Sequence, residues 1–392
     1  MDAVQIAPNI YWVGAIHWNL QNFHGYLTQR GSTFNAYLIV DEKITLIDTV
    51  KSEFSEEMFA RISKVIDPSR IDTVVVNHVE MDHSGALPAL MERVPKARVI
   101  CSGKGKEGLK AHFGETAWDY QVVKPGDSLV LGKHSLQFAM TPMVHWPDNM
   151  VTFCPEAKIL FSNDGFGQHL ATFERFNDEV NEGVVWEEAR KYFANILLCY
   201  APMVLKELES IQKFDIQMIA TSHGVIWRTK IREIFQAYRD WASNRTKDRA
   251  VIVYDSMWGS TEKMAGAVER AFSEEGLPVE KLSIQAYHIS DIATRLLDAR
   301  WICIGSPTLN NNMLPTVASF VTYLKGLAPK DRACFLFGSY GWSGQAVKLM
   351  ADALRGTGVE IRGEISLQYV PDARKLEEIA EKVRAGILNR LS

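Results

Sequence analysis

The sequence predicts two α/β domains in one chain: a sandwich of β-sheets with helices outside it, followed by a doubly wound parallel sheet. One observation is length, because 392 residues exceed one ordinary domain. Another is a change of pattern: apolar strands come largely in hairpins up to about residue 242, whereas strands and helices alternate after residue 250. Between the two patterns lies a polar run at residues 243–249. We expect it to be a linker, with domains at residues 1–247 and 248–392.

Composition excludes several classes of function. Hydrophobic residues make up 47% and charged residues 23% of the chain, as in folded globular proteins, and a net charge of −4 argues against nucleic-acid binding. The N-terminus does not resemble a signal peptide and no apolar run is long enough to cross a membrane, so we expect a cytoplasmic protein with no membrane partner. The five cysteines are scattered without a C-x-x-C pair, which excludes a four-cysteine metal site and predicts buried free thiols.

The first domain is predicted from apolar runs separated by turns. Hairpins are expected where residues 34–40 meet 44–49 and where residues 128–131 meet 134–138. Further strands are expected at residues 10–14, 73–76, 96–102, 158–163 and 218–222, and helices at 53–65, from 86 onward, at 104–113, at 186–213 and up to about 242. Many antiparallel strands followed by helices indicate a sandwich with its helices outside.

Residues 73–85 are the most informative stretch of this domain. A valine-rich buried strand leads directly into four potential metal ligands, His78, Glu80, Asp82 and His83. On an extended backbone the His-x-Glu-x-Asp alternation places three side chains on one side, and His83 then faces elsewhere and suits a second metal. The competing interpretation is a polar loop with solvated charges, which four ligand types in six positions make the minor one.

Three more potential ligands also follow apolar strands and stand next to turn-forming residues: His145, Asp164 and His223. Strand ends in one layer converge, so these side chains can meet the first four. Seven donors are too many for one tetrahedral zinc and suit two metals with a bridging carboxylate. Imidazole and carboxylate donors without thiolate favour iron or manganese over zinc. His24 and His169 are candidates for partners that orient the ligands.

The second domain is predicted from strands at residues 250–254, near 279, at 301–304, at 333–337 and at 361–370, with helices between and after them. Five such strands describe a doubly wound sheet of flavodoxin type. The loop at residues 255–261 opens into a helix and offers hydroxyls and free N–H groups to a phosphate. Because it lacks both the Walker A lysine and a G-x-G-x-x-G pattern, a monophosphate such as FMN fits. The competing interpretation is an ordinary α/β domain with polar loops.

Two later loops complete the predicted flavin site, since small, amide and aromatic residues follow the third and fourth strands and can contact or stack on the ring. The predicted flavin-binding residues are Ser256, Met257, Trp258, Gly259, Ser260, Thr261, Ser306, Pro307, Thr308, Asn310, Asn311, Asn312, Ser339, Tyr340, Gly341, Trp342, Ser343 and Gly344.

With these motifs the chain resembles the flavodiiron proteins, also called A-type flavoproteins, over essentially its whole length. The resemblance implies a metallo-β-lactamase-like αβ/βα sandwich followed by a flavodoxin-like domain. Hydrolytic relatives of the first fold usually have histidine where this chain has Glu80. The resemblance further implies that one iron takes His78, Glu80 and His145, that the other takes Asp82, His83 and His223, and that Asp164 bridges them. The catalytic residues are then these seven ligands themselves.

The same resemblance implies the function. Flavodiiron proteins reduce O2 to water or NO to N2O in the cytoplasm, and FMN passes the electrons. We expect a separate donor, rubredoxin first and reduced F420 as the alternative, because no rubredoxin module is fused here. A head-to-tail homodimer, or a dimer of such dimers, is also implied. The choice between O2 and NO stays open.

Two other functions were weighed. One is a two-metal zinc hydrolase of the metallo-β-lactamase fold with an accessory flavodoxin domain. The other is an electron carrier whose first domain only docks a partner. Glu80 argues against the hydrolase, and the complete set of seven ligands argues against the carrier.

Overall fold

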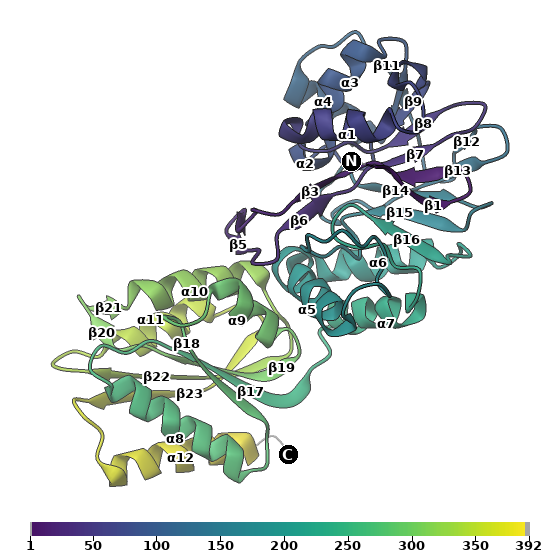
Figure 1. Cartoon of the computed structure of the whole chain (residues 1–392). Helices are drawn as coiled ribbons and strands as arrows, with labels where there is room; N and C mark the ends of the chain where they lie inside the picture. Colours follow the sequence, from purple (N-terminus) through teal and green to yellow (C-terminus); the bar gives the residue numbers. More distant parts are fainter. Residues whose placement is uncertain (1, 389–392) are drawn as a thin grey trace. The chain divides into compact units, whose positions relative to one another are not determined.

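A computed structural model describes residues 2–388 of the chain (Figure 1). It divides into two compact units, which are described separately below. Unit 1 comprises Met1–Phe193 and Tyr200–Ala242, and unit 2 comprises Ala194–Cys199 and Ser243–Ser392.

Unit 1 contains two large sheets. The seven-stranded sheet runs in the order β1 (Val4–Ala7), β2 (Ile10–Trp12), β7 (Tyr37–Ile39), β8 (Thr45–Ile47), β9 (Thr73–Val75), β10 (Arg98–Cys101) and β11 (Asp119–Val122). The five-stranded sheet runs in the order β12 (Ser128–Val130), β13 (Ser135–Met140), β14 (Met150–Cys154), β15 (Ile159–Asn163) and β16 (Met218–Thr221). Both predicted hairpins, β7 with β8 and β12 with β13, are antiparallel pairs.

The helices of unit 1 lie outside the sheets, as predicted. They are α1 (Ser55–Ile62), α2 (Met81–Ser84), α3 (Leu87–Arg93), α4 (Gly103–Phe113), α5 (Glu182–Tyr192), α6 (Ala201–Ile211) and α7 (Ile231–Ala242), with short helical turns at Ser52–Phe54 and Pro68–Arg70. Two more short turns, Phe193–Leu197 and Leu198–Tyr200, fall mostly in the segment Ala194–Cys199 of unit 2. Figure 1 shows α1, α3 and α4 over one face of the seven-stranded sheet.

Alternate residues of the central strands explain this layering. Ile47 and Val75 pack toward the second sheet, beside Phe138, whereas Leu46 and Val74 pack under the helices. A strand covered on both faces must be apolar at every position, and β8 and β9 are buried throughout. The sandwich core thus places the ends of β9, β15 and β16 where polar loops emerge.

Two small hairpins, β3 (Ala15–His17) with β6 (Ser32–Phe34) and β4 (Asn22–Phe23) with β5 (Tyr26–Leu27), lie between β2 and β7, ahead of the predicted first hairpin. The predicted strand at residues 34–40 was wrong in extent, because Phe34 ends β6 and Tyr37 begins β7. Asn35 causes the break: its backbone N–H donates to Ser222 O at 2.8 Å and its side-chain amide to Thr221 O at 2.8 Å. Those bonds draw this residue out of the hairpin ladder.

Unit 2 is a parallel five-stranded sheet in the order β18 (Val279–Ser283), β17 (Lys247–Tyr254), β19 (Ala299–Gly305), β22 (Arg332–Tyr340) and β23 (Val359–Gln368). This is the predicted doubly wound order. Its helices are α8 (Ser260–Glu274), α9 (Ile289–Leu296), α10 (Pro315–Leu327), α11 (Gln345–Leu354) and α12 (Ala373–Leu388), and β20 (Thr308–Leu309) pairs with β21 (Asn312–Met313). Figure 1 shows α8 and α12 together on one face.

The structure also bears on the predicted linker, the cysteines and the membrane-spanning helices. The linker at residues 243–249 was predicted too long, since β17 already begins at Lys247 and takes up the last three residues. Cys199 is exposed, whereas the other four cysteines are buried as predicted. Among the described residues, no helix combines the length and apolar character needed to cross a membrane.

Candidate functional site

The seven predicted metal ligands lie together in unit 1, in two groups. Within each group the ligand atoms lie within 4.8 Å of one another. The first group is His78, Glu80, His145 and Asp164, and the second is Asp82, His83 and His223. The sequence separates these residues by up to 145 positions, so the meeting of the strand ends brings them together.

Asp164 lies between the two groups. Its Oδ2 is 3.4 Å from His145 Nε2 and 3.8 Å from His78 Nε2, both in the first group. Its Oδ1 is 3.1 Å from His83 Nε2 and 3.3 Å from His223 Nε2, both in the second. Each oxygen of this carboxylate therefore faces a different group, which is the arrangement that a bridging ligand needs.

The backbone after β9 differs from the extended loop that the sequence predicted. Glu80 occupies the N-cap position of α2, so Asp82 and His83 stand on a helical turn. This turn sends Asp82 to the second group, with its Oδ2 3.2 Å from His223 Nε2. The prediction that His78, Glu80 and Asp82 project to one side was therefore wrong for Asp82.

Hydrogen bonds outside the cluster fix how two imidazoles face it. His78 Nδ1 lies 2.9 Å from Asp148 Oδ2, and His223 Nδ1 lies 2.8 Å from the carbonyl oxygen of Thr33. Because a carbonyl only accepts, His223 Nδ1 carries the proton and a neutral ring offers its Nε2 lone pair to the cluster. The sequence analysis did not single out Asp148 or Thr33. The only sign of Asp148 in the sequence was its position three residues after His145.

Three further polar side chains reach the cluster. The Tyr192 hydroxyl donates to Asp164 Oδ1 at 2.9 Å. His24 Nε2 lies 3.1 Å from Glu80 Oε1 and the His169 ring lies 5.1 Å from that of His223. Both histidines were candidates for orienting partners, and both lie beside the cluster. Tyr192 was missed, because it stands within a predicted helix without any local motif.

The predicted flavin site of unit 2 is a cavity of about 710 Å³, within the usual range for small-molecule sites. Most of the predicted residues line it: Met257, Trp258, Ser260, Pro307, Thr308, Asn310, Asn311, Ser339, Tyr340, Gly341, Trp342 and Ser343. Leu309, Tyr369 and Val370 line it as well and were missed. The last two were placed inside the predicted strand at residues 361–370, whereas β23 ends at Gln368 and leaves them on the loop after it.

The other predicted flavin residues, Ser256, Gly259, Thr261, Ser306, Asn312 and Gly344, are not among those that line the cavity. Some of them shape its loops. Thr261 Oγ1 lies 2.9 Å from Ser339 Oγ and so ties the first loop to the fourth strand. Gly259 has φ of +78° at the N-cap of α8, a conformation that side chains other than glycine rarely adopt. The Ser256 hydroxyl is buried without a hydrogen-bond partner in the described chain, which leaves it available to a phosphate.

A buried carboxylate that the sequence analysis did not assign holds these loops together. Asp255 Oδ1 accepts from Ser256 N at 2.7 Å and from the Gln285 side chain at 2.7 Å, and its Oδ2 accepts from Thr316 Oγ1 at 2.5 Å. Asp255 thus connects the end of β17, the segment after β18 and the start of α10.

Comparison with known proteins now identifies the family. Residues 33–224 match the family described as ODP family beta lactamase, and residues 252–383 match flavodoxin. The chain is 44% identical over 393 residues to a nitric oxide reductase of Moorella thermoacetica, with 98% of each chain covered. It is 41% identical over 401 residues to rubredoxin-oxygen oxidoreductase of Megalodesulfovibrio gigas, with 100% of each covered.

The chain belongs to the flavodiiron protein family. Its fold superposes on a solved flavodiiron protein from Giardia intestinalis with a TM-score of 0.95, 35% identity and coverage of 99% of this chain and 96% of that one. Membership confirms the predicted fold and the predicted resemblance. It also favours the predicted oxidoreductase over the two-metal hydrolase.

Electrostatics in this flavodiiron chain favour cations in the cluster. Burial alone lowers the pKa of His78, but hydrogen bonds with Asp148 and Glu80 outweigh it and raise that pKa to about 10. Burial also acts to lower the pKa of His223, and the surrounding carboxylates, Asp164 foremost, raise it to about 10. Imidazolium protons therefore neutralise the buried carboxylates, and metal ions can replace these protons.

The pKa of the Asp164 carboxylate shifts in the opposite direction to the pKa values of the histidines. Burial raises the pKa of Asp164, yet the imidazoles of His83, His145 and His223 hold it well below its usual range. The pKa of His145 rises to about 9, since its contacts with Asp164 and Glu80 outweigh burial. The cluster thus retains its negative charges at neutral pH.

Several buried atoms of the flavodiiron cluster lack a hydrogen-bond partner within residues 2–388. They are Asp82 Oδ1, both ring nitrogens of His83 and Asp164 Oδ2. Unpaired buried polar atoms cost about 1–3 kcal/mol each, so a group this large indicates a ligand. Nitrogen and carboxylate donors without thiolate suit iron. The residues present therefore fit two metal ions.

Proposed function

We propose that this chain is an oxidoreductase that reduces O2 to water, NO to N2O, or both, with two irons in the cluster and electrons passed through FMN. The observation that carries this proposal is Asp164, because its two oxygens face separate groups of ligands. A pair of metal ions held by these two groups would supply two redox-active centres to one gas-binding site.

In this proposal each residue has a defined role. His78, Glu80 and His145 hold one iron, Asp82, His83 and His223 hold the other, and Asp164 bridges them. Iron held there would supply the binding of the gas and the electrons for its reduction, with the flavin as the source that replaces them. Asp148 and the Thr33 carbonyl keep two of the imidazoles directed inward. No amino-acid nucleophile is required.

The flavin part of the proposal rests on unit 2. The loop of Ser256–Thr261 holds the phosphate at the N-terminus of α8, and the loops after β19 and β22 hold the ring. One cofactor then belongs to each domain, residues 1–247 and residues 248–392. Similarity to both a nitric oxide reductase and a rubredoxin-oxygen oxidoreductase supports either gas as substrate.

For the electron donor we propose rubredoxin, as the name of the second relative suggests for that protein, with reduced F420 as the alternative. The protein acts in the cytoplasm as a head-to-tail homodimer or a dimer of such dimers. Exposed apolar side chains on both units, Trp258 and Trp342 at the flavin cavity and Phe173 on unit 1, suit such a pairing. A monomer by sedimentation at micromolar concentration would contradict it.

Metal and gas measurements test the central proposal. Protein purified without air and reconstituted with ferrous iron should hold about two irons and one FMN per chain, given two ligand groups and one flavin cavity. It should then consume O2 or NO when reduced rubredoxin is supplied. Stoichiometric zinc with no iron uptake, together with hydrolytic activity, would instead favour the two-metal hydrolase.

A further inference from the structure

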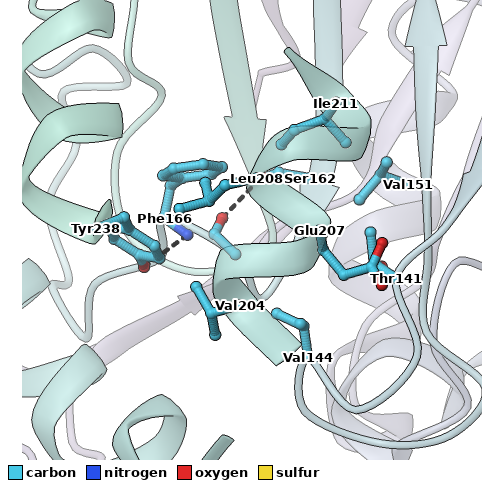
Figure 2. A pocket seen from close by; sticks show the side chains of 11 residues that line it. Thr141, Val144, Val151, Ser162, Phe166, Val204, Glu207, Leu208, Ile211 and Tyr238 are labelled. Atoms are coloured by element: carbon cyan, nitrogen blue, oxygen red, sulfur yellow. Dashed lines mark hydrogen bonds between the residues drawn. The ribbon is translucent and has the colours of Figure 1, made fainter. Parts of the chain in front are cut away.

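Unit 1 contains a small pocket apart from the metal cluster and the flavin cavity. Its volume is about 30 Å³. It lies where α6 and α7 meet the outer side of β14 and β15 (Figure 2). The residues that line it are Thr141, Val144, Val151, Ser162, Gly165, Phe166, Val204, Glu207, Leu208, Ile211 and Tyr238. The sequence analysis assigned none of them a function.

Most of the side chains that line this pocket are apolar, and two of its hydroxyl groups bond elsewhere. The Ser162 hydroxyl donates to the Gly165 carbonyl oxygen at 2.7 Å. The Tyr238 hydroxyl accepts from the backbone N–H of Phe166 at 2.7 Å. Figure 2 shows both bonds running along the wall, with the valine and leucine side chains of α6 facing the pocket.

Glu207 is the one carboxyl in the wall. It accepts from the Ser210 hydroxyl at 3.1 Å on its own helix. Burial raises the pKa of this carboxyl, although the Ser210 bond opposes the shift. Its Oε2 thus bonds along α6 and not across the pocket.

The volume and the lining of the pocket together determine which molecules it can hold. A water needs about 10–15 Å³ of this kind of space and two to four polar partners, so the pocket has room for about two waters but offers few partners. Apolar cavities of this kind stay dry and take up xenon. A diatomic gas such as O2 or NO is small and uncharged, and it fits both the volume and the lining.

The position of the pocket links it to the metal cluster. Val144 immediately precedes His145, and Gly165 immediately follows Asp164. The wall is therefore formed partly by the two loops that carry these ligands. Val144 is the only lining residue that is half-buried, whereas the others are buried. The wall is thus least shielded from solvent at Val144, the residue next to His145 in the chain.

We infer that this pocket is a holding site for the diatomic gas substrate, from which O2 or NO reaches the neighbouring metal cluster. The inference rests on the proposed function. It assigns α6, which contributes no metal ligand, a role in gas capture. Because the pocket is apolar and selects by size, it holds O2 and NO alike.

Xenon tests the site without any turnover. Crystals of the iron- and FMN-loaded protein under xenon pressure should show a xenon atom among Val204, Leu208 and Phe166. Val204→Phe should fill the pocket and abolish this peak. Met203→Phe is the matched control, because it adds a phenyl ring to the same helix at an exposed position. If Val204→Phe lowers iron or FMN content, Val204→Leu replaces it.

Gas kinetics then test the role. Val204→Phe should raise KM for O2 and for NO about three- to tenfold with kcat unchanged, since only gas uptake is impaired. Met203→Phe should match the wild type. Xenon absent from the wild-type pocket, or a filled pocket with unchanged KM for both gases, overturns the inference while gas reduction itself stands. A loaded wild-type protein that reduces neither gas overturns the proposed function whatever the xenon result.

Discussion

The metal cluster and the flavin cavity are built in opposite ways. In the cluster His78 and His83 have 0% exposure, and each buried donor is positioned by other buried groups. At the flavin cavity the largest side chains project from loops, with Trp258 92% and Trp342 89% exposed. A buried network fails as a unit when one charge is removed, whereas a loop-built cavity loses affinity by degrees. Substitutions in the metal cluster should therefore cause larger losses, and affect more of their site, than substitutions at the flavin cavity.

The largest effect is expected at Asp164. Asp164→Asn keeps the shape of the side chain but removes the charge that both ligand groups face. The four surrounding imidazoles then lack their shared carboxylate, so both irons should be lost and gas reduction should fall at least about 1,000-fold. Iron analysis and O2 or NO consumption measure this.

The flavin absorbance provides the internal check for that variant. FMN content should stay near one per chain, because the flavin cavity belongs to the other unit. Asp215→Asn is the matched control, since that carboxylate is exposed and pairs only with Lys158. Asp164→Asn protein that retains two irons and full activity would contradict the bridging role.

A smaller effect is expected at Asp148, which is not a predicted metal ligand but contacts the ligand His78. Its Oδ2 lies 2.9 Å from His78 Nδ1 and accepts from Val79 N at 2.8 Å. Asp148→Asn keeps an acceptor but loses the charge, so iron affinity should fall about 10- to 100-fold. Titration of the apoprotein with ferrous iron measures this, and Asp119→Asn on the surface is the control. Equal affinities in the two variants would remove Asp148 from the metal centre.

The contrast between the two sites also explains what the sequence could predict. Potential metal ligands recur at several strand ends, so His78, Glu80, His145 and His223 were recognisable as a joint pattern and not one by one, and the structure brings them together. The division of the ligands into two groups could not be predicted from their spacing in the sequence. The helical turn at α2 moves Asp82 away from His78, and hydrogen bonding across the loop causes that turn rather than any one residue.

Elsewhere too, local patterns in the sequence predicted some features and could not predict others. The doubly wound sheet was predictable because its three central strands, β17, β19 and β22, are largely buried and apolar, which is a local signal. The break at Asn35 was not, because its partners Thr221 and Ser222 lie far along the chain. Tyr192 also acts through a partner distant in sequence, and so does Asp255 in its bonds with Gln285 and Thr316. Patterns in sequence specify elements and residue types, while long-range hydrogen bonds decide where elements end.

On the flavin side, Asp255→Asn should have a graded and local effect. The carboxylate accepts from Ser256, Gln285 and Thr316, and an amide can keep only some of these bonds. Losing one or two should weaken FMN binding by about 1–2 kcal/mol, or roughly 10-fold. Fluorescence titration of the apoprotein measures it, with Asp352→Asn as an exposed control. Iron content should not change, and a loss of iron would contradict the separation of the two sites.

The smallest effect should arise at a carboxylate that belongs to neither site. Asp41 stands before β8, at the end of that strand opposite to the metal cluster. Its carboxylate accepts from Lys133 N at 3.0 Å and His134 N at 2.7 Å, so it fastens the turn between β7 and β8 to the turn between β12 and β13. This contact joins the two sheets of the sandwich without reaching either cofactor site.

Its pKa gives a stability prediction with a definite sign. Burial by itself raises the pKa of Asp41, but the hydrogen bonds from Lys133 and His134 lower it from 3.8 to about 2. A carboxyl with a depressed folded-state pKa stabilises the fold above its unfolded pKa and loses that contribution as pH falls toward the folded value. The window is therefore about pH 4 down to about pH 2.

Asp41→Asn should accordingly lower the free energy of unfolding of the metal-free protein by about 1–2 kcal/mol at pH 7 and by much less near pH 2. Denaturant titrations followed by tryptophan fluorescence at several pH values measure the difference between variant and wild type. Iron and FMN content at neutral pH should be unchanged, unlike in the Asp164 and Asp255 variants. A destabilisation that stays constant from pH 7 to pH 2 would show that packing rather than the charge of Asp41 joins the two turns.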